Sequence, residues 1–283
     1  MTGSVHDAIA TARRALADAG IPAADAALDA EVLARHALGW DRATLIARGR
    51  ERSPSGFDER FAELVSRRAA REPVAYITGV REFWMRDFEV TPDVLIPRPE
   101  TELVVEEALA VAAAHPPAAI VDVGTGSGCI AVTLALELPD AHVIATDISV
   151  AALAVARRNA NRYGIAPRMT FLATNVLDGL AGPLDLIVSN PPYMSADVEP
   201  SLQPEVSRFE PRQALYAGTD GLATFRRLFP AACERLADDG LLVIEFGFGQ
   251  EADVRGLARE AGLIVTGVKC DLQNIPRVAV LRR

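Results

Sequence analysis

The segment Ile120-Val-Asp-Val-Gly-Thr-Gly-Ser-Gly128 passes from a short apolar run into three closely spaced glycines. The apolar run is typical of a buried strand, and a helical pattern begins at the last glycine. Glycine permits the backbone of a sharp turn and lets the main chain approach a ligand or a neighbouring element closely. The segment therefore predicts a strand, a tight turn and a helix, as in a doubly wound α/β sheet.

Strand-like and helix-like segments alternate from Ala118 onward, which favours the same fold class. We expect a Rossmann-like, seven-stranded mixed sheet, with strands near 119–123, 142–146, 169–173, 185–189, 241–246, 264–269 and 277–282. Helices are expected near 102–114, 128–138, 150–163, 221–237 and 250–261, with Thr101 as the cap of the first. The longest irregular piece, 194–219, is too long for a simple connector and is interpreted as a substrate loop.

The first part of the chain has helical apolar spacing over 4–19, 24–38 and 42–47, and Ser53-Pro54 is expected to open a further helix. This pattern predicts a small helical bundle at 1–80. Its arginines are either the solvated face of a packing domain or part of a platform that docks a macromolecule. Residues 81–95 are aromatic-rich and predict a β-hairpin linker, and the α/β domain occupies 96–283.

The composition excludes several classes of protein. The 283 residues carry a net charge of −9, which argues against a tight nonspecific grip on a phosphate backbone. No apolar run approaches the roughly 20 residues of a membrane span, and the N-terminus has no signal-peptide pattern. The three cysteines lie far apart, without metal-type spacing, so we expect no metal site and a reducing, cytoplasmic location.

The glycine turn and a following acidic residue together indicate a nucleoside site. The spacing G-x-G-x-G, preceded by Asp122, differs from the dinucleotide pattern G-x-G-x-x-G, and the acidic residue would suit a cationic ligand. Asp147 ends the next strand about 20 residues later, where a carboxylate can accept both ribose hydroxyls. A purely structural turn with a capping aspartate is the alternative.

Within a Rossmann-like sheet these features resemble the S-adenosylmethionine site of class I methyltransferases. The resemblance implies that Asp147 binds the ribose, that Ile148 and Asn190 also belong to the cofactor site, and that residues 124–128 (Gly124, Thr125, Gly126, Ser127 and Gly128) face the methionine part. It places the adenine near Asn175 and Val176. Members of the class often have an acidic residue at the position of Asn175.

A second distinctive stretch, Asp185-Leu-Ile-Val-Ser-Asn-Pro-Pro-Tyr193, predicts a buried strand that ends in a rigid turn. The turn resembles that of methyltransferases acting on a planar nitrogen of adenine, cytosine, guanine or a carboxamide. The Asn190 oxygen and the Pro191 carbonyl can accept the hydrogens of an NH₂ group and aim its nitrogen at a methyl donor. Tyr193 can pack on the planar face of the acceptor. The alternative is a structural role, in which Asn190 only caps a turn.

Four further motifs, together with this turn, favour one of these acceptors by resemblance. They are Arg71-Glu-Pro-Val-Ala-Tyr-Ile-Thr-Gly79, Leu95-Ile-Pro-Arg-Pro-Glu-Thr-Glu102, Ser189-Asn-Pro-Pro-Tyr193, Phe209-Glu-Pro-Arg-Gln-Ala-Leu215 and Asp220-Gly-Leu222. In this order they resemble the peptide chain release factor N5-glutamine methyltransferases (the PrmC/HemK family), nearly end to end. The resemblance implies S-adenosylmethionine as methyl donor and the glutamine of the Gly-Gly-Gln loop of class I release factors as acceptor. It implies that Arg98, Glu100, Thr101, Pro192 and Glu210 lie near the acceptor, and that the helical domain docks the release factor.

The main rival is a nucleic-acid amino-methyltransferase acting on adenine N6 or guanine N2, which would need a basic groove. Residues 96–283 carry 16 basic and 23 acidic groups, so no such groove is evident. A non-catalytic binding domain and a dehydrogenase are further alternatives, opposed by the intact Asp147 and Asn190 and by the glycine spacing. We expect a monomer without direct contact to nucleic acid or membrane.

Overall fold

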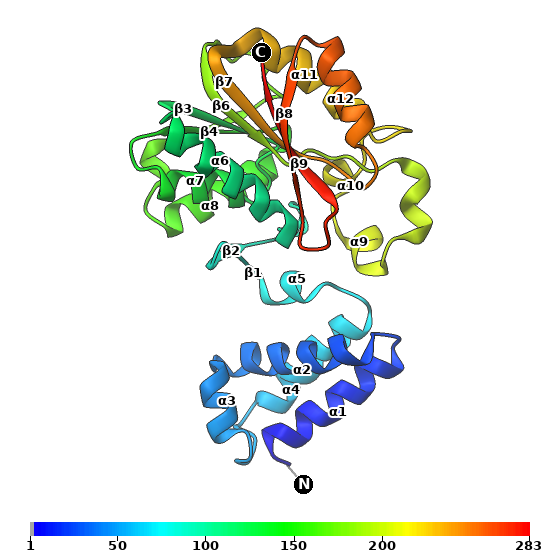
Figure 1. Cartoon of the computed structure of the whole chain (residues 1–283). Coiled ribbons are helices and arrows are strands. Elements are labelled where there is room, and N and C mark those ends of the chain that lie inside the picture. Colours follow the sequence, from blue (N-terminus) through cyan, green and yellow to red (C-terminus); the bar gives the residue numbers. More distant parts are fainter. Residues whose placement is uncertain (1–2) are drawn as a thin grey trace. The chain divides into compact units, whose positions relative to one another are not determined.

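The computed structural model describes residues 3–283, which divide into two compact units (Figure 1). A helical unit contains the chain up to Val80 together with the separate segment Gln203–Phe209. A sheet unit contains Arg81–Leu202 and Glu210–Arg283. The chain therefore passes from one unit to the other three times. Within the described residues, no helix is both long and apolar enough to cross a membrane.

The helical unit consists of amphipathic helices that bury their apolar faces in one core. Helix α1 begins with a capping box, in which Ser4 and Asp7 satisfy each other's backbone N–H groups. Helix α2 ends where Gly39 adopts the left-handed conformation. Leu33 and Phe57 are fully buried between the helices. The helices are α1 (Val5–Asp18), α2 (Ala23–Leu38), α3 (Arg42–Arg48), α4 (Phe57–Ala69), α5 (Val74–Thr78) and α9 (Pro204–Phe209).

The helix expected to open at Ser53-Pro54 begins later, so this prediction is wrong at its start. The chain makes a turn there, in which the Phe57 N–H donates to the Pro54 carbonyl at 3.1 Å. Gly56 has a φ of 75°. A left-handed residue interrupts a right-handed helix, so α4 begins only at Phe57.

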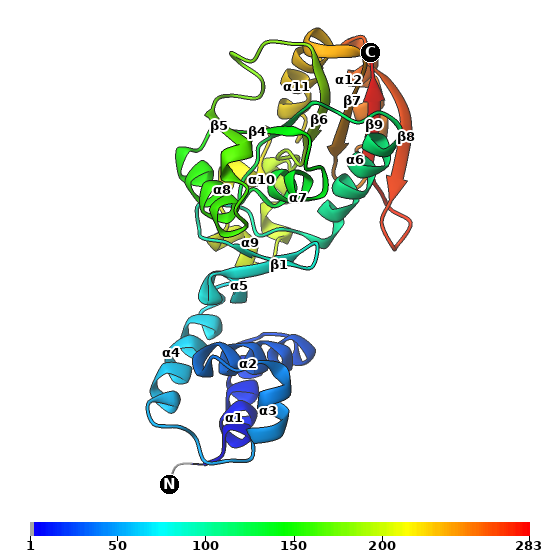
Figure 2. The same cartoon turned by 90° about the vertical axis from the view of Figure 1, so that its left-hand side faces the viewer.

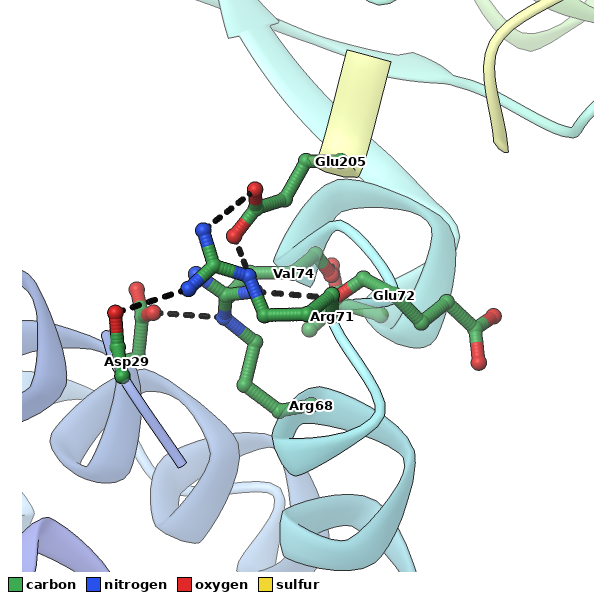
Figure 3. Close-up of polar contacts among 8 residues, drawn as sticks. Asp29, Arg68, Arg71, Glu72, Val74 and Glu205 are labelled. Carbon is green, nitrogen blue, oxygen red and sulfur yellow. Dashed lines mark hydrogen bonds and ion pairs between the residues drawn. The ribbon is translucent and has the colours of Figure 1, made fainter. Parts of the chain in front are cut away.

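The arginines of α4 do not all lie on a solvated face, because Arg68 is only 6% exposed. Its Nε donates to Asp29 Oδ2 at 2.7 Å, and its Nη1 donates to Glu205 Oε1 at 2.8 Å. Arg71 Nη2 donates to the second oxygen of Glu205 at 2.8 Å (Figure 3). We call Asp29, Arg68, Arg71 and Glu205 the Glu205 cluster. It ties α9 to α2 and to the end of α4 by charge-assisted hydrogen bonds.

The expected hairpin is formed by β1 (Val80–Phe83) and β2 (Arg86–Glu89). Trp84 and Met85 form its turn, with φ values of 52° and 56°, the backbone of a type I′ turn that matches the twist of the strands. Such values are strained for residues with a Cβ atom. The Trp84 N–H donates to Glu102 Oε1 at 2.8 Å, which helps to hold the turn in this conformation.

The sheet unit is built on seven strands in the order β5-β4-β3-β6-β7-β9-β8. Strands β5 to β7 in this order run parallel, whereas β9 is antiparallel to both β7 and β8. The expected seven-stranded mixed sheet is therefore confirmed. The strands are β3 (Ala119–Val123), β4 (His142–Asp147), β5 (Met169–Ala173), β6 (Leu184–Ser189), β7 (Leu236–Glu245), β8 (Ile264–Cys270) and β9 (Pro276–Arg282).

Helices cover both faces of this sheet (Figure 2). Side chains alternate along each strand, so Ile120 of β3 packs into the core beneath α6, α7 and α8, while Val121 packs into the core beneath α11 and α12. Both strand residues are fully buried, which explains the nearly continuous apolar strands of the sequence. The helices are α6 (Glu102–Ala114), α7 (Cys129–Glu137), α8 (Val150–Arg162), α11 (Ala223–Arg235) and α12 (Glu251–Glu260).

The segment 194–219 is not irregular as expected. It contains η3 (Ala196–Ser201), α9 and α10 (Arg212–Leu215). Each of these helices has four to six residues, too few to repeat an apolar spacing along the sequence. Two other single turns, η1 (Pro99–Thr101) and η2 (Ala166–Arg168), precede α6 and β5.

Candidate active site

A cleft of about 430 Å³ lies at the carboxyl ends of β3, β4, β5 and β6, within the sheet unit. Clefts that bind small molecules have volumes of about 300–1,000 Å³ and lie at this edge of doubly wound sheets. Most of the site residues expected from the sequence line it, namely Thr101, residues 124–127, Asp147, Ile148, Asn175, Val176 and residues 190–192. The expected residues Arg98, Glu100, Gly128, Tyr193 and Glu210 are not among those that line the cleft.

The glycine turn after β3 forms one wall of the cleft. The N–H groups of Gly124 and Thr125 both donate to the Thr146 carbonyl at 2.9 Å, which fixes the turn to the end of β4. Gly124 has a φ of 73°, and a Cβ atom built on it would meet open space. At Gly128 a Cβ atom would lie 3.0 Å from the Cβ of Ala156 in α8. Gly124 therefore faces the cleft, whereas Gly128 allows two helices to pack closely.

Asp122 lies beneath the turn and does not line the cleft. It is fully buried, and its Oδ2 accepts a 2.6 Å hydrogen bond from the Thr125 hydroxyl. Burial raises the pKa of Asp122 to about 7, against the opposing effect of this hydrogen bond. The side chain thus braces the turn from within and is not directed at a cationic ligand.

Asp147 stands at the end of β4 on the rim of the cleft. Its Oδ2 accepts from the Gly126 N–H at 2.9 Å, and its Oδ1 accepts from the Ser149 N–H at 2.8 Å. Burial raises the pKa of this carboxyl, and the backbone hydrogen bonds oppose the shift. A carboxylate oxygen can accept more than one hydrogen bond, so both oxygens can still bind a pair of hydroxyl groups.

The wall beyond β5 contains a strained residue. Val176 has a φ of 57°, a left-handed conformation that is rare for a β-branched residue. The Thr146 hydroxyl donates to its carbonyl at 3.2 Å and so helps to hold it there. Strain of this kind is typical of binding sites, where the surrounding structure enforces it. Asn175 precedes Val176 and lines the same wall.

Asn190 follows β6 directly, and its side chain is part of a hydrogen-bonded chain. Its Nδ2 donates to the Thr101 hydroxyl at 2.8 Å, and that hydroxyl donates to Glu245 Oε2 at 2.7 Å. Thr101 is the N-cap residue of α6, as expected, but its side chain makes no capping hydrogen bond. The residue has α-helical backbone angles, whereas a capping threonine needs an extended backbone. Its hydroxyl instead joins η1 to the ends of two strands.

Glu245 is the functional candidate that the sequence analysis missed. It is the last residue of β7, and Ser189 of β6 pairs with Ile244 of β7. The next residues along these parallel strands, Asn190 and Glu245, therefore lie at the same edge of the sheet. The signal in the sequence was an acidic residue that ends a buried strand. This signal points to the site only when the strand order is known, because β7 lies next to β6 in the sheet.

Tyr193 is directed at Glu245. Its hydroxyl donates to Glu245 Oε1 at 3.1 Å, and its carbonyl accepts from Gln250 Nε2 at 2.9 Å. Burial and the neighbouring carboxylate raise the pKa of the Tyr193 phenol. The four-residue turn is thus fixed at its first and last side chains through the same carboxylate.

Arg98 and Glu210 form an ion pair in which Glu210 is buried and Arg98 is partly exposed, and neither residue lines the cleft. Arg98 Nη2 donates to Glu210 Oε1 at 2.5 Å, and the Ile96 N–H donates to Glu210 Oε2 at 3.2 Å. Burial raises the pKa of Glu210, which is 5% exposed, and Arg98 opposes that shift. The pair joins the segment before η1 to the segment between α9 and α10. Tyr216 and Arg227, which the sequence analysis did not single out, line the cleft as well.

The fold and the cleft define a Rossmann-like methyltransferase preceded by a helical domain. Residues 7–79 match the family model of the PrmC N-terminal domain, and residues 101–204 match that of the methyltransferase small domain. The chain is 44% identical over 276 residues to the release factor glutamine methyltransferase of Cereibacter sphaeroides, covering 98% of this chain and 97% of that protein. Its identity to the enzyme of the same name from Geobacter sulfurreducens is 46%, over 93% and 91% of the two chains. The chain belongs to the release factor glutamine methyltransferase family.

A solved structure supports the fold at greater distance. The hMettl16 catalytic domain matches with a TM-score of 0.57 at 17% identity, over 78% of this chain and 82% of that chain. In residues 3–283 there is no group of three or more His, Cys, Asp or Glu side chains that could hold a metal ion.

Proposed function

We propose that the protein transfers the methyl group of S-adenosylmethionine to the side-chain amide nitrogen of the glutamine in the Gly-Gly-Gln loop of class I peptide chain release factors. The observation that carries the proposal is the state of Asn190. Its Nδ2 is committed to Thr101, which leaves its Oδ1 as a hydrogen-bond acceptor at the end of β6. A carboxamide NH₂ group is a matching donor.

The residues present fit the cofactor. Gly124 and Gly126 offer exposed backbone beside the end of β3, and Asp147 offers two carboxylate oxygens to the ribose hydroxyls. Asn175 and Val176 form the wall expected to hold the adenine. S-adenosylmethionine, when bound, supplies a methyl group on a positively charged sulfur, which leaves as a neutral thioether.

The acceptor nitrogen is a weak nucleophile because its lone pair is delocalised into the amide. The Asn190 oxygen and the Pro191 carbonyl would each accept one hydrogen of the NH₂ group and so orient the nitrogen. The same two oxygens favour the positive charge that develops there as the new N–C bond forms. The alkylated nitrogen is acidic and releases a proton to water, so the site needs no strong base.

We assign the helical unit to docking of the release factor, with the protein acting as a monomer in the cytoplasm, where translation ends. The relatives carry the release-factor name over nearly their full length, including this unit. A nucleic-acid acceptor is less well supported, because the net charge of the chain is −9.

The deciding experiment supplies S-adenosylmethionine with a labelled methyl group to the purified protein and a class I release factor. We expect label in the release factor and none in a release factor whose loop glutamine is replaced by alanine. DNA and ribosomal RNA, added as competing acceptors, should stay unlabelled. Equal labelling of both release factors would refute the assignment of the glutamine, and labelled nucleic acid would favour the rival function.

A further inference from the structure

Four side chains form a continuous hydrogen-bonded chain that runs back from the wall of the cleft: Asn190 and Thr101, which line it, and then Glu245 and Tyr193. The links are 2.8 Å from Asn190 Nδ2 to the Thr101 hydroxyl, 2.7 Å from that hydroxyl to Glu245 Oε2, and 3.1 Å from the Tyr193 hydroxyl to Glu245 Oε1. Thr101 is 2% exposed and Glu245 is 1% exposed, so water has little access to the hydrogen bond between these two residues.

The chemistry of the groups sets the direction of every link. An ionised carboxylate only accepts hydrogen bonds, so the single hydroxyl hydrogen of Thr101 points to Glu245. The Thr101 oxygen is then left with lone pairs and requires a donor on its other side. The carboxamide of Asn190 can supply that donor only by presenting Nδ2, which turns Oδ1 to the opposite side. The opposite flip would place two acceptors against each other.

We infer that Glu245 is a positioning residue that, through Thr101, holds the Asn190 carboxamide with its oxygen available to the NH₂ group of the acceptor. The inference rests on the proposed function. Glu245 acts from behind the site, because it is not among the residues that line the cleft. Its second oxygen, which accepts from Tyr193, fixes the far end of the same turn.

The ionisation state of Glu245 adds a dependence on pH. Burial raises the pKa of this carboxyl to about 7, and the two hydroxyl donors oppose the shift. Among the charged groups around it, Glu100 of η1 raises the pKa and Arg277 of β9 lowers it. Cys129 of α7 is also close enough to interact, but burial raises its own pKa to about 12, so it stays neutral. A protonated Glu245 could donate a hydrogen bond to the Thr101 hydroxyl. The Thr101 hydrogen would then no longer have to point to Glu245, and Asn190 would no longer have to present its Nδ2.

The primary test compares two substitutions at Thr101. Thr101→Val keeps the shape but removes the hydroxyl, whereas Thr101→Ser keeps the hydroxyl. With the release factor as substrate, we expect Thr101→Val to lower kcat by about 10- to 100-fold, the scale of a misplaced reacting group. KM and the calorimetric affinity for S-adenosylmethionine should stay within about threefold, and Thr101→Ser should keep most of the activity.

The matched control is Thr133→Val in α7. Thr133 is fully buried, its hydroxyl has no hydrogen-bond partner among residues 3–283, and it does not line the cleft. This substitution makes the same chemical change at another buried threonine of the sheet unit, and we expect it to leave kcat unchanged. An equal loss of kcat in Thr133→Val and Thr101→Val would overturn the positioning role in favour of a general packing defect.

A second variant and a second readout keep the inference testable if Thr101→Val folds poorly. In the wild type, kcat should decline below about pH 7 as Glu245 becomes protonated. Glu245→Gln retains the shape of the side chain but can donate to Thr101 at any pH, so its kcat should be lower and should not show this decline. In nitrogen-labelled protein, the Asn190 NH₂ group should exchange with solvent slowly in the wild type and in Thr101→Ser, and faster in Thr101→Val.

The outcomes separate the inference from the proposed function. If the wild-type protein labels no release factor, the proposed function fails, whatever the variants do. If the wild type is active and Thr101→Val keeps its kcat with slow NH₂ exchange, the positioning role fails and the function stands. The double variant Thr101→Val/Glu245→Gln should be no worse than the poorer single variant, because both break one chain. Additive losses would also contradict it.

Discussion

Asn190 combines two tasks at the scale of a single residue. Its nitrogen anchors it to Thr101, and its oxygen is the group we assign to the acceptor. A carboxamide is suited to both tasks because it carries a donor and an acceptor on one planar group. Aspartate could not donate to Thr101, and alanine could do neither.

We expect Asn190→Ala to reduce kcat for release factor methylation by about 10²–10³, the usual effect of removing one preorganised hydrogen-bonding group from a reacting centre. The affinity for S-adenosylmethionine should change little, because Asp147 and the glycine turn remain. Steady-state kinetics and calorimetry on the same preparations check this, with the exposed Asn161→Ala in α8 as control. A parallel collapse of cofactor binding would instead make Asn190 a structural residue.

Two glycines of the same turn should separate stability from binding. Gly128→Ala places a Cβ atom 3.0 Å from that of Ala156, at a φ of 81°, so we expect the free energy of unfolding to fall by about 2–4 kcal/mol. Gly124→Ala adds a Cβ atom in open space at a φ of 73°, so its loss should be about 1 kcal/mol. Gly124→Ala should nevertheless weaken cofactor binding more than Gly128→Ala does. Urea unfolding measures the free energy of unfolding of both variants, and calorimetry measures their cofactor affinity. A larger loss of stability in Gly124→Ala, or a larger loss of cofactor affinity in Gly128→Ala, would contradict these two roles.

At the scale of elements, the sequence predicted most of the long strands and helices closely, but β7 begins at Leu236, within the helix that was expected to reach 237. The strand predicted at 119–123 is Ala119–Val123, because a buried parallel strand is apolar throughout. The helices of 194–219 were missed because they are too short for periodicity. The link from Thr101 to Glu245 spans 144 positions, and only the order of the strands brings it together. Local pattern therefore located the cleft but not Glu245, which supports it from outside the lining.

The short helix α9 depends on charge, since none of its residues is fully buried. Glu205 accepts from both Arg68 and Arg71, and Arg68 is nearly inaccessible to solvent. Removal of one partner from a buried ion pair costs about 3–5 kcal/mol. We expect Glu205→Ala to lower the free energy of unfolding of the helical unit by an amount at the lower end of this range, because Arg68 keeps Asp29.

Urea unfolding and limited proteolysis of the full chain measure this effect. Cleavage within 203–209 should become faster in Glu205→Ala. The control is Glu251→Ala, which breaks the more exposed pair with Arg255 in α12 and should leave both readouts unchanged. Unaltered proteolysis of α9 in Glu205→Ala would show that the Glu205 cluster does not hold the helix.

At the scale of the whole molecule, the two buried carboxyls Asp122 and Glu245 make stability depend on pH. Burial raises the pKa of each to about 7 in the folded protein, from 3.8 and 4.5. Between those values the folded state keeps protons that the unfolded state has lost, so the free energy of unfolding falls as pH rises from about 4.5 to 7. Each carboxyl contributes up to about 1.4 kcal/mol per pH unit.

Urea unfolding at pH 5, 6, 7 and 8 should show this decline, levelling off above about pH 7. In Glu245→Gln the slope should decrease by the share of one carboxyl. Identical slopes in the two proteins would mean that Glu245 titrates alike in the folded and unfolded states. The arrangement also implies that the pH range of greatest stability lies below the range in which Glu245 is ionised.

The separate segment of the helical unit has a consequence for inheritance. A gene fragment that encodes only residues 1–80 specifies the arginines of the Glu205 cluster but not the glutamate that neutralises them. Recombination at that boundary would transfer a helical unit without Glu205, in which the buried Arg68 keeps only Asp29 as an ion-pair partner. The gene that lost residues 1–80 would still encode α9, but without the two arginines that pair with Glu205. Exchange of such a domain between genes succeeds only if two distant pieces of sequence move together, so we expect the two units to descend as a pair.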